Sequence, residues 1–220
     1  MSIYNGKIYN KVKKDGFEET GLVLKNLQVI ECELEAYEVF DVSCEGNRIE
    51  KSYIVRSGID GGTIANCEVV NSKLEESGIS GLEMVNCKFE DNEFLLVDIT
   101  HAKIKENSLK QQILESLFLN DVLSENNDFS KCVLPMLTIR KSNLKSNNFN
   151  NCKINEGEME YTVFEENNLK NAEFTKSYFK RCTFKHMNFR DTKFENVQFI
   201  ECKFEDCLYT EEQAGMLGLI

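Results

Sequence analysis

The chain of 220 residues has no tryptophan, a single proline and only two histidines. None of its apolar runs approaches about 18 residues, which excludes a membrane-spanning helix. The first 16 residues contain no apolar segment of the kind that a secretory signal requires, so we expect a cytoplasmic protein. The scarcity of proline suits strands that use their backbone N–H groups in ladder hydrogen bonds.

The composition is that of a chain that can fold on its own. Hydrophobic residues make up 41% of it, which is enough to build a core and excludes wholesale disorder. The net charge is -11, and because binding to phosphate needs clustered Lys and Arg, we expect no direct contact with nucleic acid. Nine cysteines in a chain without a secretory signal indicate metal binding, redox chemistry or simple burial.

A period of five residues organises the sequence. Every fifth residue from Leu24 to Phe204 belongs to one apolar column, and 35 of its 37 positions are aliphatic or aromatic. The exceptions are Cys44 and Ser124. A second column, two residues earlier in each five, holds small, apolar or amide side chains, and neither column contains a charged residue. Two positions of each five therefore face inward and three face solvent.

Segments such as 172–176 (AEFTK) and 202–206 (CKFED) resemble pentapeptide repeats. In that family a small residue is followed by a polar one, by Leu or Phe, and by two more polar ones. The resemblance extends over roughly residues 22 to 207. It implies an all-β fold, a right-handed quadrilateral parallel β-helix in which four pentapeptides form one coil. We expect about nine coils, each in contact only with its neighbours.

Three segments follow from this pattern. Residues 1–20 lie outside the two columns and are predicted to be an N-terminal cap segment, with Asn5-Gly6 marking a hairpin. Residues 21–208 are predicted to form the pentapeptide-repeat β-helix. Within it, residues 107–124 also fit a helical spacing, which leaves a kink open there, but the register continues on both sides.

The last segment, residues 209–220, is predicted to form a short C-terminal helix. Thr210 and Gln213 have the spacing of a capping box, and apolar residues follow. We expect this helix to cap the solenoid and to mediate dimerisation. The candidate residues for the dimer interface are Met216, Leu217, Leu219 and Ile220.

No catalytic, cofactor or metal site is expected. Eight of the nine cysteines occupy the small inward column and Cys44 the apolar one, which indicates buried, reduced thiols. CxxC or Cys/His pairs that converge on a metal are lacking. His101 and His186 are at outward positions, and Gly61-Gly62 is not followed by the Lys-Ser/Thr of a phosphate-binding loop. We therefore expect a protein that is not an enzyme.

The repeat maps the surface charge onto four faces. We number them by their first inward residue: face 1 through Leu24, face 2 through Val29, face 3 through Leu34 and face 4 through Val39. Faces 3 and 4 hold -8 of the -10 charge of the solenoid. The candidate binding residues on these acidic faces are Glu33, Glu35, Glu38, Asp41, Glu75, Glu76, Glu93, Asp98, Glu156, Glu158 and Glu160.

Two functions fit this surface. The chain resembles the Qnr-type pentapeptide repeat proteins, and the resemblance implies a homodimeric DNA mimic that binds DNA gyrase or topoisomerase IV and confers quinolone resistance. The alternative is a non-enzymatic scaffold for another protein partner, with no topoisomerase role. Outward apolar residues would mark the site of such a partner, for example Ile30, Phe40, Val55, Val70, Leu95 and Leu96.

Overall fold

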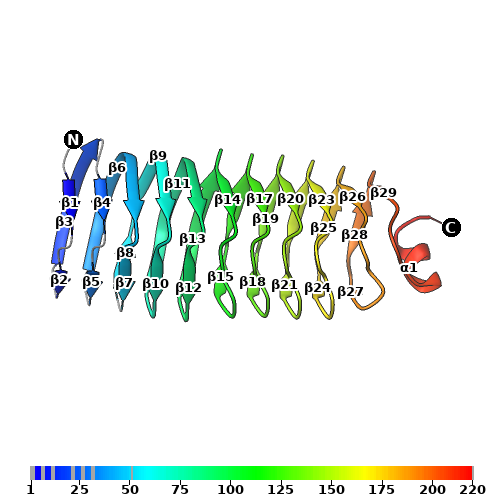
Figure 1. Ribbon diagram of the computed structural model, residues 1–220. Helices are drawn as coiled ribbons and strands as arrows, with labels where there is room; N and C mark the ends of the chain where they lie inside the picture. Colours follow the sequence, from blue (N-terminus) through cyan, green and yellow to red (C-terminus); the bar gives the residue numbers. More distant parts are fainter. Residues whose placement is uncertain are drawn as a thin grey trace.

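The protein is a rod of stacked coils, with the N-terminus at one end and a short helix at the other (Figure 1). It is described from a computed structural model. Side chains are described for residues 43–219, residues 51 and 53 excepted. The backbone is described for residues 3–5, 8–10, 13–20, 23–25, 28–30, 33–50 and 52–219.

Almost every pentapeptide contributes a short strand to one face. Face 1 contains β1 (Ile3–Asn5), β4 (Val23–Lys25), β14 (Lys103–Lys105), β17 (Leu123–Glu125), β20 (Asn143–Lys145), β23 (Val163–Glu165), β26 (Thr183–Lys185) and β29 (Lys203–Glu205). Face 2 contains β2 (Ile8–Asn10), β5 (Gln28–Ile30), β7 (Arg48–Glu50), β10 (Glu68–Val70) and β12 (Lys88–Glu90). Face 3 contains β8 (Tyr53–Val55), β15 (Ile113–Glu115), β18 (Val133–Pro135), β21 (Lys153–Asn155), β24 (Glu173–Thr175) and β27 (Lys193–Glu195). Face 4 contains β16 (Phe118–Asn120), β19 (Thr138–Arg140), β22 (Glu158–Glu160), β25 (Tyr178–Lys180) and β28 (Gln198–Ile200). Longer strands turn a corner and serve two or three faces: β3 (Lys13–Thr20), β6 (Glu33–Glu45), β9 (Gly58–Ala65), β11 (Lys73–Val85) and β13 (Glu93–Thr100).

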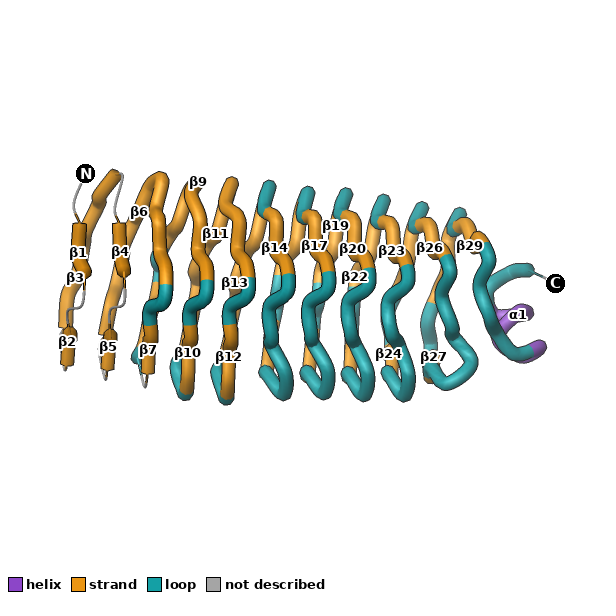
Figure 2. The backbone as a smooth tube through the Cα atoms, in the orientation of Figure 1, coloured by secondary structure: helices purple, strands orange, loops and turns teal. Residues whose placement is uncertain are grey.

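The strand pairings confirm a parallel β-solenoid. They join residues 20 positions apart, as in Val69 with Phe89 on face 2 and Phe164 with Phe184 on face 1. From Ser108 onward, isolated bridges replace the strands of face 2. Figure 2 shows the same change along the lower edge of the rod, where strands give way to loops after β12. The segment 107–124 contains β15 and β16 in this register, so the helical spacing there produces no helix.

The corners between faces have a backbone conformation that the charge pattern did not reveal. The residue two places after an inward hydrophobe has a positive φ, for example 56° at Asp121 and 52° at Tyr161. Such values belong to the left-handed region, which β-branched residues avoid. No β-branched residue is among the described positive-φ corners, where Asn is common. Each corner residue therefore turns the chain onto the next face.

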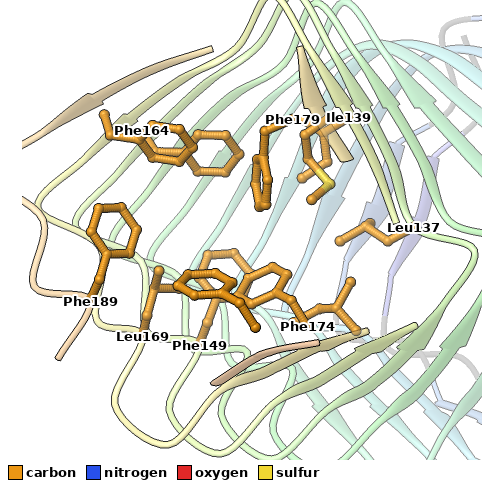
Figure 3. A pocket seen from close by; sticks show the side chains of 12 residues that line it. Leu137, Ile139, Phe149, Phe164, Leu169, Phe174, Phe179 and Phe189 are labelled. Atoms are coloured by element: carbon orange, nitrogen blue, oxygen red, sulfur yellow. The ribbon is translucent and has the colours of Figure 1, made fainter. Parts of the chain in front are cut away.

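Phenylalanine rings fill the C-terminal half of the core. Phe164 and Phe184 stack with 5.2 Å between ring centroids, and Phe179 and Phe199 stack at 4.9 Å. Figure 3 shows the rings and aliphatic side chains around a narrow gap between the faces. The gap has a volume of about 20 Å³ and an entirely apolar lining, so it has room for about one water molecule and no polar partner for it. It is a packing gap and offers no site for a ligand.

The small inward column is a ladder of hydrogen bonds between coils. The amide of Asn127 donates to the carbonyl of Ile104 at 2.8 Å, and its Oδ1 accepts the backbone N–H of Asn107 at 2.9 Å. Ser124, an exception in the apolar column, is buried and donates to Asn147 Oδ1 at 3.1 Å. These contacts satisfy polar groups that would otherwise be buried without partners.

Cysteines occupy other rungs of the same ladder. All eight described cysteines are free, as predicted, but only five are buried, because Cys44, Cys202 and Cys207 are half-buried. Cys32 lies outside the described residues. The thiol of Cys132 donates to the carbonyl of Leu109 at 2.8 Å, and that of Cys152 donates to Phe129 at 2.8 Å. A hydrogen bond with Cys132 and burial raise the pKa of Cys152, so this thiol stays protonated.

The predicted N-terminal cap and its hairpin are wrong. β1 pairs in parallel with β4 and β2 with β5, so the solenoid already includes these strands. The pairings place Lys14 opposite Leu34 and Glu19 opposite Val39, at register positions of the apolar column. These two charges interrupted the column and hid the repeat. A neighbouring coil supports parallel pairing, whereas an isolated hairpin is only marginally stable.

The C-terminal helix α1 (Glu211–Met216) begins as predicted, with a capping box between Thr210 and Gln213. Gln213 also donates to the carbonyls of Phe189 at 2.7 Å and Thr192 at 3.1 Å. Its side chain thus continues the ladder of hydrogen bonds between coils beyond the last pentapeptide of face 2. Leu217 is only 5% exposed and belongs to the core cluster, so it was wrongly assigned to a dimer interface. The helix has only six residues, and the side chain of Leu217 packs into the core and holds the helix against the solenoid.

Candidate protein-binding surface

The predicted acidic residues do not form one continuous array. Glu75, Glu76 and Glu93 lie on adjacent coils of face 3, and Asp98 follows on face 4. Glu156, Glu158 and Glu160 lie closer to the C-terminus, separated from the first group by the coils of Leu114 and Leu134. The side chains of Glu33, Glu35, Glu38 and Asp41 lie outside the described residues, although their backbone is in β6.

Several of these carboxylates are paired with bases of the same chain. Lys73 Nζ lies 3.2 Å from Glu75 and 3.9 Å from Glu93. Arg140 lies 3.5 Å from both Glu158 and Glu160. Lys176 lies 3.8 Å from Glu156. Each pair connects neighbouring outward positions, and together they weaken the negative potential that a DNA-like surface needs.

Five acids on faces 3 and 4 have no ion pair within the described part of the chain: Asp60, Glu76, Asp98, Glu115 and Glu195. Glu76, Asp98 and Glu115 are the three nearest to the middle of the rod. Glu76 is at a corner, and Asp98 and Glu115 are on β13 and β15. Partial burial raises the pKa of the Asp98 carboxyl above its usual range. Glu115 was not among the predicted site residues, although it also lies on face 3.

An apolar patch lies between the two acidic groups, in the middle of the rod where β13, β15 and β18 are neighbours (Figure 1). Its members are Leu96, Ile113, Val133 and Met136, which are 49%, 46%, 42% and 43% exposed. Leu95 and Pro135 lie beside them and are half-buried. Leu95 and Leu96 were predicted as outward apolar residues, and Ile113, Val133 and Met136 could have been found by the same criterion. The patch is the strongest departure from a charged surface on face 3.

The other predicted outward apolar residues do not extend it. Val55 and Val70 are half-buried, and the side chains of Ile30 and Phe40 lie outside the described residues. They lie on earlier coils than the patch.

Other chemistry-bearing groups are dispersed. His101 Nδ1 lies 2.9 Å from Asp121 and His186 Nδ1 lies 3.8 Å from Asp206, in exposed pairs at corners. Across the residues that the structure describes, no three His, Cys, Asp or Glu side chains gather as metal ligands would. Within the same residues, no helix is long and apolar enough to cross a membrane.

These features define a class of protein, a parallel β-solenoid of five-residue repeats that presents side chains on flat outer faces. Residues 168–206 match the family model described as pentapeptide repeats, in eight copies. These residues are therefore similar to pentapeptide repeats, and the strand pairings continue the same 20-residue register through the other described coils.

No curated protein matches the sequence. Among solved structures, a form of QnrB1, a plasmid-mediated fluoroquinolone resistance protein, shares 11% identity, with 96% of this chain and 95% of that chain covered and a TM-score of 0.47. HetL, a pentapeptide repeat protein involved in heterocyst differentiation regulation from the cyanobacterium Nostoc sp. strain PCC 7120, shares 11% identity, with 91% and 88% covered and a TM-score of 0.33. The A-module of the mannuronan C-5 epimerase AlgE4 of Azotobacter vinelandii shares 9% identity, with 92% and 78% covered and a TM-score of 0.33.

Proposed function

We propose that the protein is a non-enzymatic, cytoplasmic binding module whose protein partner docks on faces 3 and 4, and that this partner is DNA gyrase or topoisomerase IV. The observation that carries the proposal is the concentration of negative charge on these two adjacent faces. A topoisomerase binds DNA through a basic surface, which an acidic rod complements. The sequence resemblance to the Qnr-type proteins is what suggests this partner.

The acids that have no ion pair carry most of this binding. Glu76 and Asp98 can interact with a basic partner at once, whereas the paired acids would first have to release their own bases. DNA mimicry on this chain is therefore local, at the N-terminal side of the apolar patch. Its affinity should fall as salt is raised, because exposed charges are screened.

The test is a supercoiling assay with DNA gyrase, with and without a quinolone. Micromolar protein should protect the enzyme from the drug, and the double variant Glu76→Lys with Asp98→Lys should lose most of that protection. Glu83→Lys, an exposed reversal on face 1, is the matched control and should keep it. Absence of protection by the unmodified protein would reject the topoisomerase as partner.

In that case the second candidate, a scaffold for a different protein, remains. It is supported by the apolar patch, because a DNA mimic has no need of exposed aliphatic side chains at the centre of its acidic surface.

We also propose that the protein is a homodimer joined at its C-terminal end. The inward rings of the last coil, Phe194, Phe199 and Phe204, are only partly covered. Exposed apolar side chains surround this end: Leu208, Tyr209, Met216 and Leu219. Ile220 lies outside the described residues. A second copy placed end to end would cover the rings and the unpaired edges of the last strands.

Light scattering tests the dimer. The double variant Met216→Glu with Leu219→Glu should convert a dimer into a monomer, because like charges would face each other across the interface. Leu123→Glu, an exposed apolar residue on face 1, should leave the mass unchanged. A monomeric mass for the unmodified protein would disprove the dimer.

A further inference from the structure

The apolar patch is not needed by the fold. Leu96, Ile113, Val133 and Met136 are all at outward positions of their pentapeptides. The inward residues of the same coils, Phe94, Leu114 and Leu134, already fill the core and are almost fully buried. Aliphatic residues exposed together on three successive coils indicate a contact surface.

Carboxylates without an ion pair lie within the patch and on its N-terminal side, whereas Lys153 follows Val133 on the next coil. In the parallel register Glu115 is paired with Leu95, so it lies within the patch. Glu76 precedes Leu96 by one coil at the same corner, and Asp98 lies two residues after Leu96. Within the described residues, none of these three carboxylates has an ion pair. A ligand for the patch must therefore offer positive charge beside apolar groups.

The combination of apolar side chains and unpaired carboxylates limits which kinds of ligand can bind the patch. Nucleic acid is repelled by the carboxylates and has no aliphatic groups for Leu96 or Ile113. A second copy of the same face would place Glu76, Asp98 and Glu115 against their own equivalents, and like charges in an interface are costly. A basic amphipathic segment of another protein meets both requirements.

The dimensions also fit such a segment. Successive coils are about 4.8 Å apart, so Leu96 and Met136, two coils apart, span about 10 Å along the rod. An α-helix rises about 5.4 Å in each turn, and apolar side chains at positions i, i+4 and i+7 therefore span a similar distance. Lys or Arg on the flanks of that stripe would reach the carboxylates.

We propose that the apolar patch of face 3, with Glu76, Asp98 and Glu115, is a docking site for a basic amphipathic helix of a partner protein. The site does not require the partner to be a topoisomerase. The proposal of a docking site would still stand if the supercoiling assay showed no protection. It would be disproved if face 3 bound its partner by charge alone.

Fluorescence anisotropy with a synthetic peptide tests the proposal. The probe is a labelled 14-residue helical peptide with Leu at i, i+4, i+7 and i+11 and Lys elsewhere. We expect saturable binding below 1 mM, at least tenfold weaker binding to the double variant Ile113→Ser with Val133→Ser, and at least threefold weaker binding to Glu76→Gln with Glu115→Gln. Leu123→Ser, the matched control on face 1, should bind as the unmodified protein does.

Two control peptides separate the contributions. A peptide with Glu in place of every Lys, and one with Ser in place of every Leu, should both fail to bind. If the double serine variant is unfolded by circular dichroism, Val133→Thr replaces it, with an expected threefold loss. No saturable binding, equal binding of the Glu peptide, or an equal loss in Leu123→Ser would overturn the proposal. A fall in the solution mass on substituting Ile113 and Val133 would assign the patch to a second copy and overturn it as well.

Discussion

Phe184→Ala is expected to lower the free energy of unfolding by about 3–5 kcal/mol, the range for truncating a buried aromatic residue. Phe184 is 1% exposed and stacks between Phe164 and Phe204 at centroid distances of 5.2 and 5.1 Å. It also makes edge contacts with Phe179 and Phe189 at 5.3 and 5.5 Å. The substitution would leave a cavity that the backbone of the coils cannot close, because parallel pairing on each side fixes it.

Urea denaturation followed by circular dichroism measures this loss. Phe118→Ala is the control, since Phe118 is at an outward, half-buried position of face 4. It should cost about 1 kcal/mol, as is common for substitutions outside the core. Comparable losses at the two positions would show that inward ring stacking does not dominate the stability of this half of the rod.

Asn127→Ala should be destabilising by about 2–4 kcal/mol, although it removes only a few atoms. Asn127 is 1% exposed and bonds to Ile104, Ser124 and Asn147 through its amide. Its Oδ1 accepts the backbone N–H of Asn107. Alanine would leave the Ile104 carbonyl and the Asn107 N–H buried without these partners, and each unsatisfied group costs about 1–3 kcal/mol.

Two further variants distinguish hydrogen bonding from volume. Asn143→Ala changes the same residue type at an exposed position on β20 and should cost within about 0.5 kcal/mol. Asn127→Ser should recover part of the loss, because Ser142 shows that a hydroxyl can accept the backbone N–H of the coil before it, at 3.1 Å from Val122. If serine is no better than alanine in chemical denaturation, the ladder contributes little.

The prediction of the fold from the sequence was successful where burial alone decides the residue type. The inward columns exclude charge because a buried charge is costly, and this rule located both columns. It failed at Lys14 and Glu19, where the register continues although the residues are charged. At these two positions the backbone hydrogen bonds between strands continue the solenoid, and they require no particular side chain that the sequence could show.

The binding surface could be predicted only in part. Face charge shows which side of the rod carries the excess of acidic residues, but not which carboxylates are neutralised. Lys73 and Glu93 are 20 residues apart, yet they lie 3.9 Å from each other because they are on adjacent coils. The same stacking brings Leu96, Ile113 and Val133 into one patch, although they are spread over 38 residues of sequence. A period of five indicates which residues face outward, and the lateral neighbours follow only once the length of the coil is known.

By itself, the sequence determined the period, the inward columns, the reduced cysteines among the described residues and the capped C-terminal helix. These depend on whether individual side chains at a constant spacing are hydrophobic or form hydrogen bonds. Only the tertiary structure decided where the solenoid begins, which acids remain unpaired, and that Leu217 lies in the core instead of at an interface. These depend on contacts between coils, where the neighbour of a residue lies 20 positions away in the sequence. At the C-terminal end they depend on the helix that packs against the last coil.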